Sequence, residues 1–246
     1  MDTDAIIASY LSPEQMSRVR TFASTLLEWN EHMNLTGATT VDEVLSRHVA
    51  DSLALIPPIE AALASSTTSS SPSHTPRILD VGSGAGFPGV ALAIARPRWE
   101  VTLLDTLQKR VAFLDAAAEE CGATNVKTLW SRAEDAGKVG SEHREAYDIV
   151  TARAVAELRT LAELCVPLVR VGGSWVAAKN STTSTAAETA AAAAAVELLG
   201  GAPLVAVEVQ SEGPDGEMRT AVVSAKARET PGKYPRRAGL ANKRPL

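Results

Sequence analysis

The sequence predicts an α/β fold in which a mostly parallel sheet is covered by helices on both faces. Three observations indicate this fold. From residue 77 onward, short apolar runs alternate with segments of helical period. The first of these runs ends in a glycine-rich loop, and the last two are separated by a tight-turn signature. With 45% apolar and 22% charged residues, the 246-residue chain is not disordered or collagen-like.

Residues 1–63 predict a helical cap. Ser12-Pro13-Glu14 combines an N-cap with a proline at the first helical position, and apolar residues then recur every three or four positions to about Glu31. Residues 34–37 break this helix. Residues 40–43 (TVDE) predict a capping box that opens a second helix.

The main domain is expected at residues 77–228. Residues 64–76, rich in Ser and Thr, bury little apolar surface and predict a mobile linker before it. The elements expected in the domain are strands at 77–81, 100–104, 125–130, 147–152 and 173–179, with helices at 88–95, 107–121 and 157–170. This alternation requires right-handed crossovers and therefore parallel strands.

The end of the domain predicts a different strand arrangement. An Ala-rich helix at 185–199 precedes an apolar run at 203–209, and residues 213–216 (GPDG) turn the chain back into a run at 219–225. Two strands joined by a tight turn are antiparallel. We therefore expect an antiparallel C-terminal edge strand on the sheet.

The charge distribution singles out a basic tail at 229–246. Residues 226–246 hold seven Lys or Arg against one Glu, a net charge of +6, whereas the whole chain carries −5 and the remainder therefore −11. A basic tail is either a solvated, mobile end or a contact for a polyanion. The sequence leaves both interpretations open.

The glycine loop after the first strand is the strongest functional signal. Counted from Gly82, the dinucleotide pattern G-x-G-x-x-G fails because Phe87 stands in place of its third glycine; counted from Gly84 it is met, but starts two residues late. The arrangement Asp80-x-Gly82-x-Gly84-x-Gly86 instead resembles the first motif of S-adenosylmethionine-dependent methyltransferases. A carboxylate beside the loop favours a cationic cofactor and repels a pyrophosphate.

A second carboxylate, Asp105, ends the second strand 23 residues after Gly82. At this position it can accept hydrogen bonds from both ribose hydroxyls of either cofactor class. The alternative is that Asp105 caps the helix at 107–121.

Eight motifs in one order resemble a known family. They are Asn34-Leu35-Thr36, Arg47-His48-x-x-Asp51-Ser52, the loop from Asp80 to Gly89, Leu104-Asp105 with Lys109-Arg110, Arg132-Ala133-Glu134, residues 152–156 (ARAVA), Ala178-Lys179, and residues 233–239 (KYPRRAG) followed by 243–246 (KRPL). From about residue 20 to the C-terminus, the sequence resembles the bacterial small-subunit ribosomal RNA guanine-N7 methyltransferases, RsmG, also called glucose-inhibited division protein B. The resemblance implies a Rossmann-like class I methyltransferase sheet, an enzyme that uses S-adenosylmethionine, and small-subunit (16S) ribosomal RNA or a 30S particle as partner. We also expect a cytoplasmic monomer without a metal.

The resemblance also assigns candidate site residues. Those implied for the cofactor are Asp80, Gly82, Gly84, Gly86, Phe87, Asp105, Thr106, Leu107, Ala133 and Glu134. Arg153 is placed on the catalytic face, and the RNA contacts would be Arg47, His48, Lys179, Arg236 and Arg237. Transfer to guanine N7 needs no base because N7 already carries an in-plane lone pair, so the enzyme supplies orientation and electrostatics.

Structural alternatives remain for several of these residues. Arg153 could form an ion pair with Asp80 or Glu134, and Arg47 could pair with Asp51 one helical turn away. His48 could be a core histidine rather than a base.

Other classes of protein are less consistent with the sequence. Cys121 and Cys165 occupy helical apolar patterns typical of inert core residues, and the four histidines lack metal-ligand spacing. An acidic start and the lack of a long apolar run predict neither a signal peptide nor a membrane span. Two alternative functions stay open, a nicotinamide-dependent oxidoreductase and a non-catalytic nucleoside-binding regulatory module.

Overall fold

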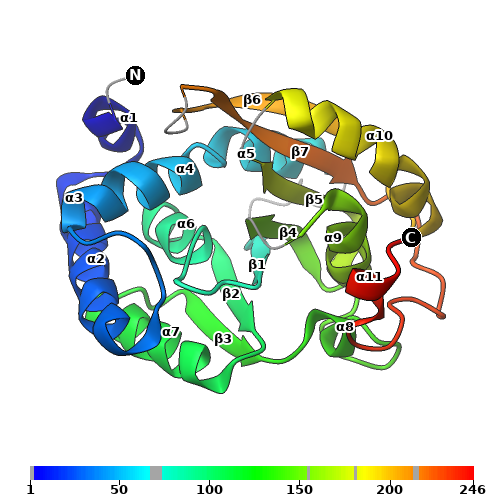
Figure 1. The fold of residues 1–246 in the computed structure, drawn as a ribbon, viewed down its shortest axis with the longest axis horizontal. Helices are drawn as coiled ribbons and strands as arrows, with labels where there is room; N and C mark the ends of the chain where they lie inside the picture. The colour runs from blue at the N-terminus through cyan, green and yellow to red at the C-terminus, as the bar shows by residue number, and fades with distance from the viewer. Residues whose placement is uncertain (1–2, 67–73, 154–155, 180–181, 213–215) are drawn as a thin grey trace.

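One seven-stranded sheet forms the centre of the computed structural model (Figure 1). The structure describes residues 3–66, 74–153, 156–179, 182–212 and 216–246. In these residues the strands are β1 (Arg77–Val81), β2 (Glu100–Asp105), β3 (Val126–Trp130), β4 (Tyr147–Arg153), β5 (Val169–Lys179), β6 (Val205–Glu212) and β7 (Met218–Ala225). Their order across the sheet is β3-β2-β1-β4-β5-β7-β6.

The strand directions confirm the predicted fold class. Strands β1 to β5 pair in parallel, whereas β7 is antiparallel to both β5 and β6. The C-terminal pair therefore forms the expected antiparallel edge, with β6 outermost. Three residues of the predicted turn, 213–215, lie outside the described residues.

The order of the parallel strands creates a crevice. Strand β1 lies between β2 and β4, so the chain leaves β1 toward one side of the sheet and later returns on the other. In open α/β sheets, ligands bind outside the carboxyl ends of the strands at such a switch point.

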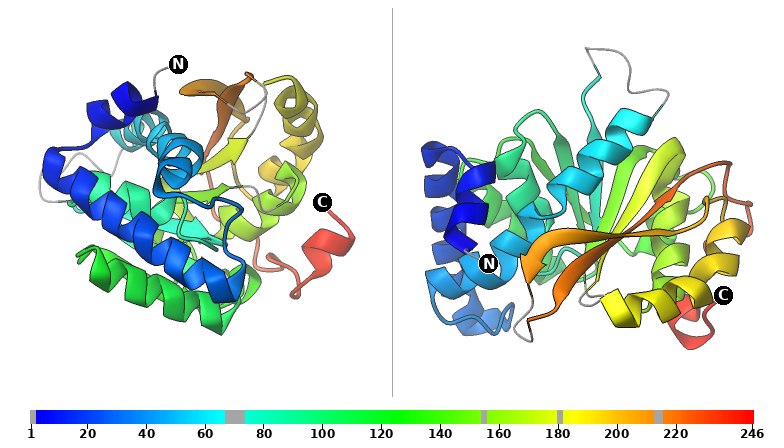
Figure 2. Two further views of the ribbon diagram at one scale, coloured as in Figure 1. Left: turned by 60° about the vertical axis from the view of Figure 1, so that its left-hand side comes forward. Right: turned by 90° about the horizontal axis from the view of Figure 1, so that it is seen from above.

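Helices cover both faces of the sheet, as Figures 1 and 2 show. Adjacent β1 residues alternate between the faces: Ile78 packs in the core with α6 (Gly89–Ala95) and α7 (Gln108–Glu120), and Leu79 packs in the core with α9 (Leu158–Cys165). The helices α8 (Ala133–Ala136), α10 (Thr182–Leu198) and α11 (Leu240–Lys243) lie on the same side as α9.

The N-terminal helices share the core of the sheet. They are α1 (Thr3–Tyr10), α2 (Pro13–Met33), α3 (Val41–Val44), a π-helical turn (Leu45–Val49), α4 (Ala50–Leu53) and α5 (Ile56–Ser65). The predicted start of α2 is confirmed, because the Ser12 hydroxyl accepts from the Gln15 N–H and the Gln15 side chain accepts from the Ser12 N–H. Phe22 of α2 is fully buried and packs edge-on against Phe87.

The segment after α5 is fixed to the sheet where it is described. Residues 67–73 of the expected linker lie outside the described residues. Immediately after them, His74 Nε2 lies 3.0 Å from Asp148 Oδ1, and the N–H of Arg77 donates to Asp148 Oδ2 at 2.7 Å.

The two largest differences from the predicted boundaries are at the end of α9 and the start of β5. The helix expected at 157–170 ends at Cys165 and continues as a 3₁₀ turn, Val166–Leu168, and β5 begins at Val169 rather than 173. Pro167 explains the early end because proline cannot donate the helical hydrogen bond.

The basic tail is packed against the domain. Tyr234 and Ala241 are buried, and α11 contacts α9. The interpretation of the tail as a solvated, mobile end is therefore wrong, because these side chains and several backbone bonds hold it in place.

Candidate active site

A cavity of about 490 Å³ opens at the carboxyl ends of β1, β2 and β4. Its lining comprises Val81, Gly82, Leu104, Asp105, Thr106, Arg110, Arg132, Ala133, Glu134, Arg153, Leu164, Gly239 and Asn242. Six of these were predicted from the sequence for the cofactor or for catalysis: Gly82, Asp105, Thr106, Ala133, Glu134 and Arg153. A larger groove of about 810 Å³ between α5 and β6 has Glu208 as the one charged residue in its described lining, so it offers little polar chemistry.

The loop after β1 requires its glycines. Gly82, Gly84 and Gly86 have φ of 74°, 55° and 88°, the left-handed region that residues with a Cβ rarely adopt. A Cβ on Gly86 would lie 2.9 Å from Phe22 Cζ. The N–H groups of Gly82 and Ser83 donate to the carbonyl of Leu104, so the loop is fixed to the end of β2.

Asp105 joins this loop to the next helix. Its Oδ2 accepts from the Gly84 N–H at 3.0 Å, and its Oδ1 accepts from the Leu107 N–H at 2.9 Å. Arg110 lies 3.6 Å from the same carboxylate. Asp105 therefore accepts from the residue just before α7 and also lines the cavity, but it is not the N-cap of α7, which is Leu107. Because Asp105 already accepts from Gly84, this carboxylate beside the loop disfavours a pyrophosphate there.

Asp80 lies beneath the loop and not in the cavity lining. It is fully buried, and its Oδ2 accepts from the Gly89 N–H at 3.1 Å. Its Oδ1 has no hydrogen-bond partner among the described residues. Burial raises the pKa of Asp80 to about 6. Asp80 can therefore act on a cofactor through charge but is placed below the surface that a cofactor would touch.

Arg153 ends β4 at the cavity and points its guanidinium toward the helical cap. Its Cζ lies 5.2 Å from the centre of the Phe87 ring, and its Nη1 donates to the His48 carbonyl at 3.4 Å. Arg153 forms no ion pair with Asp80 or Glu134, all three being described residues, so the expected structural alternative is wrong. Burial lowers the pKa of Arg153 from its usual value.

His48 is held as a neutral, structural histidine. Its Nε2 lies 2.8 Å from the Thr36 hydroxyl, and its ring centre is 5.1 Å from that of Phe87. Burial, followed by the charges of Arg153 and Arg47, lowers the pKa of His48 to about 4. This agrees with the interpretation that His48 is not a base.

The expected Arg47–Asp51 ion pair is wrong. Arg47 lies 3.5 Å from Glu43 Oε1, whereas Asp51 lies 3.3 Å from Arg219 Nη2. The π-helical turn from Leu45 to Val49 changes the angular spacing between Arg47 and Asp51, so these two side chains point to different partners. Arg47 remains exposed near the cap.

The other predicted RNA contacts divide into two kinds. Arg237 is exposed, whereas Lys179 Nζ pairs with Glu188 Oε2 at 2.7 Å and only 14% of its side chain is exposed. Arg236 forms a bidentate pair with buried Glu163, whose shortest contact is 2.5 Å. The prediction that Arg236 contacts RNA is therefore corrected, because its guanidinium is used within the protein. The guanidinium satisfies a carboxylate that would otherwise be buried without a partner.

Glu134 connects the cavity to the tail. Its Oε1 accepts from the Gly239 N–H at 2.7 Å. Gly239 and Asn242 therefore join the cavity wall, although the sequence assigned them no role; Gly239 belongs to the KYPRRAG motif, which was the available signal.

Other chemistry finds little support in the described residues. Cys121 and Cys165 are free and buried, as predicted for core residues. Across these parts of the chain, no three His, Cys, Asp or Glu side chains are grouped as metal ligands. None of the helices described combines the length and the apolar character needed to cross a bilayer.

Comparison with known proteins adds independent information. The family described as GidB, rRNA small subunit methyltransferase G, matches residues 15–212. The ribosomal RNA small subunit methyltransferase G of Clostridium beijerinckii is 42% identical over 237 residues, covering 96% of this chain and 92% of the relative. The protein of the same name from Moorella thermoacetica is 37% identical and covers 100% of this chain and 99% of the relative.

Solved structures support the fold. The METTL16 MTase domain is similar with a TM-score of 0.55 and 16% identity, covering 93% of each chain. Cofactor-bound Rv0187 from MTB is similar with a TM-score of 0.53 and 18% identity, covering 92% of this chain and 97% of that one.

Proposed function

Because the chain belongs to the rRNA small subunit methyltransferase G family, we propose that it transfers a methyl group from S-adenosylmethionine to N7 of a guanine in small-subunit ribosomal RNA. The observation that carries this proposal is the convergence of Gly82, Asp105, Glu134 and Arg153 on one cavity. Neither alternative function has comparable support, since the comparisons name methyltransferases and the Gly84 amide is already bonded to a carboxylate.

The cavity suits a cationic nucleoside cofactor. Its volume of about 490 Å³ falls within the range of about 300–1,000 Å³ typical of small-molecule sites. Asp105 lies in the wall, and the unpartnered Oδ1 of buried Asp80 lies below the loop. These two carboxylates favour positive charge in the part of the ligand that lies at the loop, while Arg110, Arg132 and Arg153 line other parts of the cavity. When bound, S-adenosylmethionine supplies an electrophilic methyl group on a sulfonium.

The residues of the chain bind and orient the reactants. We assign Asp105 to the ribose hydroxyls, Ala133 and Glu134 to the adenine, and the loop from Gly82 to Phe87 to the amino-acid end of the cofactor. Arg153 contributes a guanidinium from the end of β4, where it orients the guanine or its phosphate. No side chain has to remove a proton, and His48 with its pKa near 4 stays neutral at pH 7.

The RNA is expected to contact the cap and the tail around the cavity. Arg47 of the cap and Arg237 of the tail are exposed, and Lys179 lines a small pocket with Asp51 and Leu55 of the cap. Guanine N7 faces the major groove, which is deep and narrow in A-form RNA, so the target lies in a loop or a distorted site. We further propose that the protein works as a monomer in the cytoplasm, where its substrate is found.

The proposal is tested by mapping methylated bases in ribosomal RNA. Small-subunit RNA from a deletion strain should lack one N7-methylguanine by mass spectrometry, and the wild-type gene should restore it while an Arg153→Ala gene should not. Purified protein should be stabilised thermally by S-adenosylmethionine and not by NADH. Unchanged methylation in the deletion strain would contradict the assignment to ribosomal RNA.

A further inference from the structure

The C-terminal segment, residues 229–246, supplies one wall of the cavity. Gly239 and Asn242 line the cavity beside Ala133 and Glu134, and Asn242 lies in the short helix α11. This wall comes from a part of the chain more than 100 residues beyond Glu134. Its position therefore depends on how the segment is held.

The segment is fixed next to Asn242 on both sides. Before it, the Gly239 N–H donates to Glu134 at 2.7 Å, and the Ala241 carbonyl accepts from the Thr160 hydroxyl at 3.4 Å. After it, the Arg244 carbonyl accepts from Arg236 Nη2 at 2.7 Å. These contacts place the backbone of α11 against α8 and α9.

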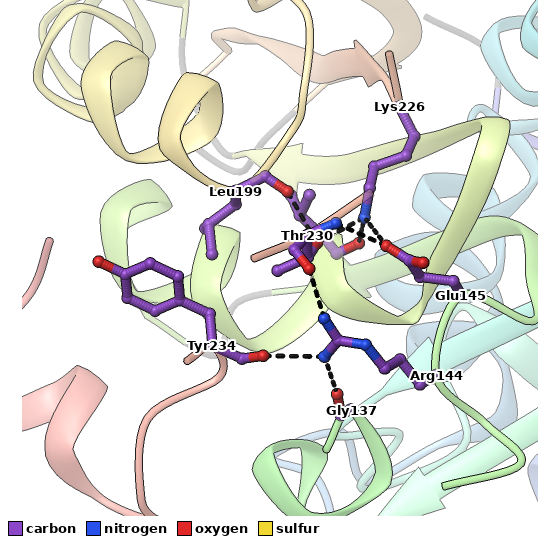
Figure 3. Close-up of polar contacts among 8 residues, drawn as sticks. Gly137, Arg144, Glu145, Leu199, Lys226, Thr230 and Tyr234 are labelled. Carbon is purple, nitrogen blue, oxygen red and sulfur yellow. Dashed lines mark hydrogen bonds and ion pairs between the residues drawn. The ribbon is translucent and has the colours of Figure 1, made fainter. Parts of the chain in front are cut away.

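A second set of contacts holds the start of the segment (Figure 3). Arg144 donates to the carbonyls of Gly137, Thr230 and Tyr234 at 2.6–2.8 Å. Lys226 donates to the Thr230 hydroxyl at 2.6 Å and pairs with Glu145 at 3.1 Å. Because these donors come from the main domain, contacts within the chain itself hold the start of the segment in place.

Asn242 presents an unused carboxamide at this wall. The side chain is exposed and has no hydrogen-bond partner among the described residues. A carboxamide both donates and accepts, so it can bind the edge of a purine that offers an amino group and a ring nitrogen. Glu134, the acceptor assigned to the adenine, uses Oε1 for Gly239 and as a carboxylate can only accept, whereas Asn242 can also donate to a ring nitrogen.

We propose that Asn242 is a cofactor-binding residue that recognises the adenine edge of the cofactor and sets its specificity for adenosine. This inference rests on the proposed function. The contacts around Gly239, Ala241 and Arg244 hold this carboxamide at the cavity wall that also contains Glu134, the residue assigned to the adenine.

The probes are S-adenosylhomocysteine and S-inosylhomocysteine, which differ at the purine 6-position. Isothermal titration calorimetry measures the Kd of each probe for the unmodified full-length chain and for the variants N242A, N242L and K243A. We expect N242A and N242L to bind S-adenosylhomocysteine about tenfold more weakly and to lose most of the preference over S-inosylhomocysteine. The K243A variant, which changes the neighbouring exposed residue, should keep both the affinity for S-adenosylhomocysteine and the preference over S-inosylhomocysteine.

The outcomes separate this inference from the proposed function. Unchanged affinity in N242A, or an equal loss for both probes, would overturn the role of the carboxamide while leaving the cofactor assignment intact. If the unmodified protein binds neither probe, the proposed function and the inference both fail. Melting temperatures without ligand should agree among all four proteins, because the Asn242 side chain is exposed.

Discussion

The N–H of Gly84 donates to Asp105 Oδ2 at 3.0 Å, so the glycine loop is joined directly to the residue proposed for the ribose. The same carboxylate accepts from the Leu107 N–H. Loss of this side chain should therefore affect the shape of the loop as well as its ligand.

Asp105→Ala is expected to weaken cofactor binding. It removes a charge-assisted hydrogen bond, worth about 1.5–3 kcal/mol, which corresponds to roughly a ten- to hundredfold increase in Kd. Calorimetric titration with S-adenosylhomocysteine measures the change, and Asp115→Ala on the exposed side of α7 is the control. Wild-type affinity in Asp105→Ala would remove this residue from the site.

Arg153→Ala is expected to spare cofactor binding and to lose transfer. The guanidinium contacts Phe87 and the His48 carbonyl, and its loss leaves the proposed ribose and adenine contacts in place. We expect kcat to fall on the order of 10²-fold in a labelled-methyl assay with 30S particles, with the Kd of S-adenosylhomocysteine unchanged. The reverse pattern would show that Arg153 holds the cofactor.

Asp80 and His48 should give opposite pH effects on stability. The pKa of His48 is lowered to about 4, so the unfolded chain binds more protons and stability falls as pH drops from 6.5 toward 4. The pKa of Asp80 is raised to about 6, so the folded state holds the extra proton and stability rises as pH drops from 6 toward 3.8.

Urea unfolding at pH 7 and pH 5 measures these two contributions. His48→Gln should lose less stability on acidification than the parent, and Asp80→Asn should lose more, each by about 1–2 kcal/mol. Changes of the same sign in both variants would contradict the two pKa shifts.

The basic tail should contribute to RNA affinity through its exposed charges. The double change Arg237→Ala and Arg244→Ala should reduce the slope of log K against log salt by about 1–2, because each lost phosphate contact removes about 0.7 for single-stranded RNA. Exposed Arg98 lies at the opposite end of the sheet, before β2, and Arg98→Ala should leave the slope unchanged. An unaltered slope in the double variant would exclude the tail from the interface.

Arg236→Ala should act on stability instead. The change leaves buried Glu163 without its cation, a loss of about 3 kcal/mol, visible as a lower urea midpoint. Arg237→Ala, at the next position but exposed, is the matched control. Equal stability of the two variants would contradict a structural role for Arg236.

Gly89→Ala tests how closely α6 approaches the sheet. An added Cβ would lie 2.1 Å from Leu103 Cδ2 and 2.9 Å from Asp80 Oδ2, so we expect a loss of about 1–3 kcal/mol of unfolding free energy. Gly37→Ala has nothing within 4 Å of the added atom and should change stability little. Thermal unfolding of both variants makes the comparison.

The sequence predicted the parallel strands well because their apolar runs end in strong local signals. Strand β1 begins and ends at the predicted residues because Gly82 stops its apolar run. Helix α5 was not singled out within the predicted cap; Pro57 and Pro58 lie in its first turn, where proline is tolerated.

Parts of the site depend on distant contacts that no local pattern reveals. Asp105 and Arg153 could be placed because both end strands of one parallel sheet. The proposed role of Asn242 could not be predicted, because it depends on the tail folding back onto the domain. The Arg236–Glu163 pair that holds the tail joins residues 73 positions apart. The π-helical turn that separates Arg47 from Asp51 likewise leaves no mark in residue spacing.

The Phe87 ring touches Phe22 and His48 of the cap and the guanidinium of Arg153 on the sheet. One aromatic side chain thus connects three stretches of polypeptide that are remote in sequence. Melting of the cap alone would expose that ring and release the loop that carries it. We therefore expect calorimetry to record a single heat-absorption peak, because neither part retains its native contacts once the other has unfolded.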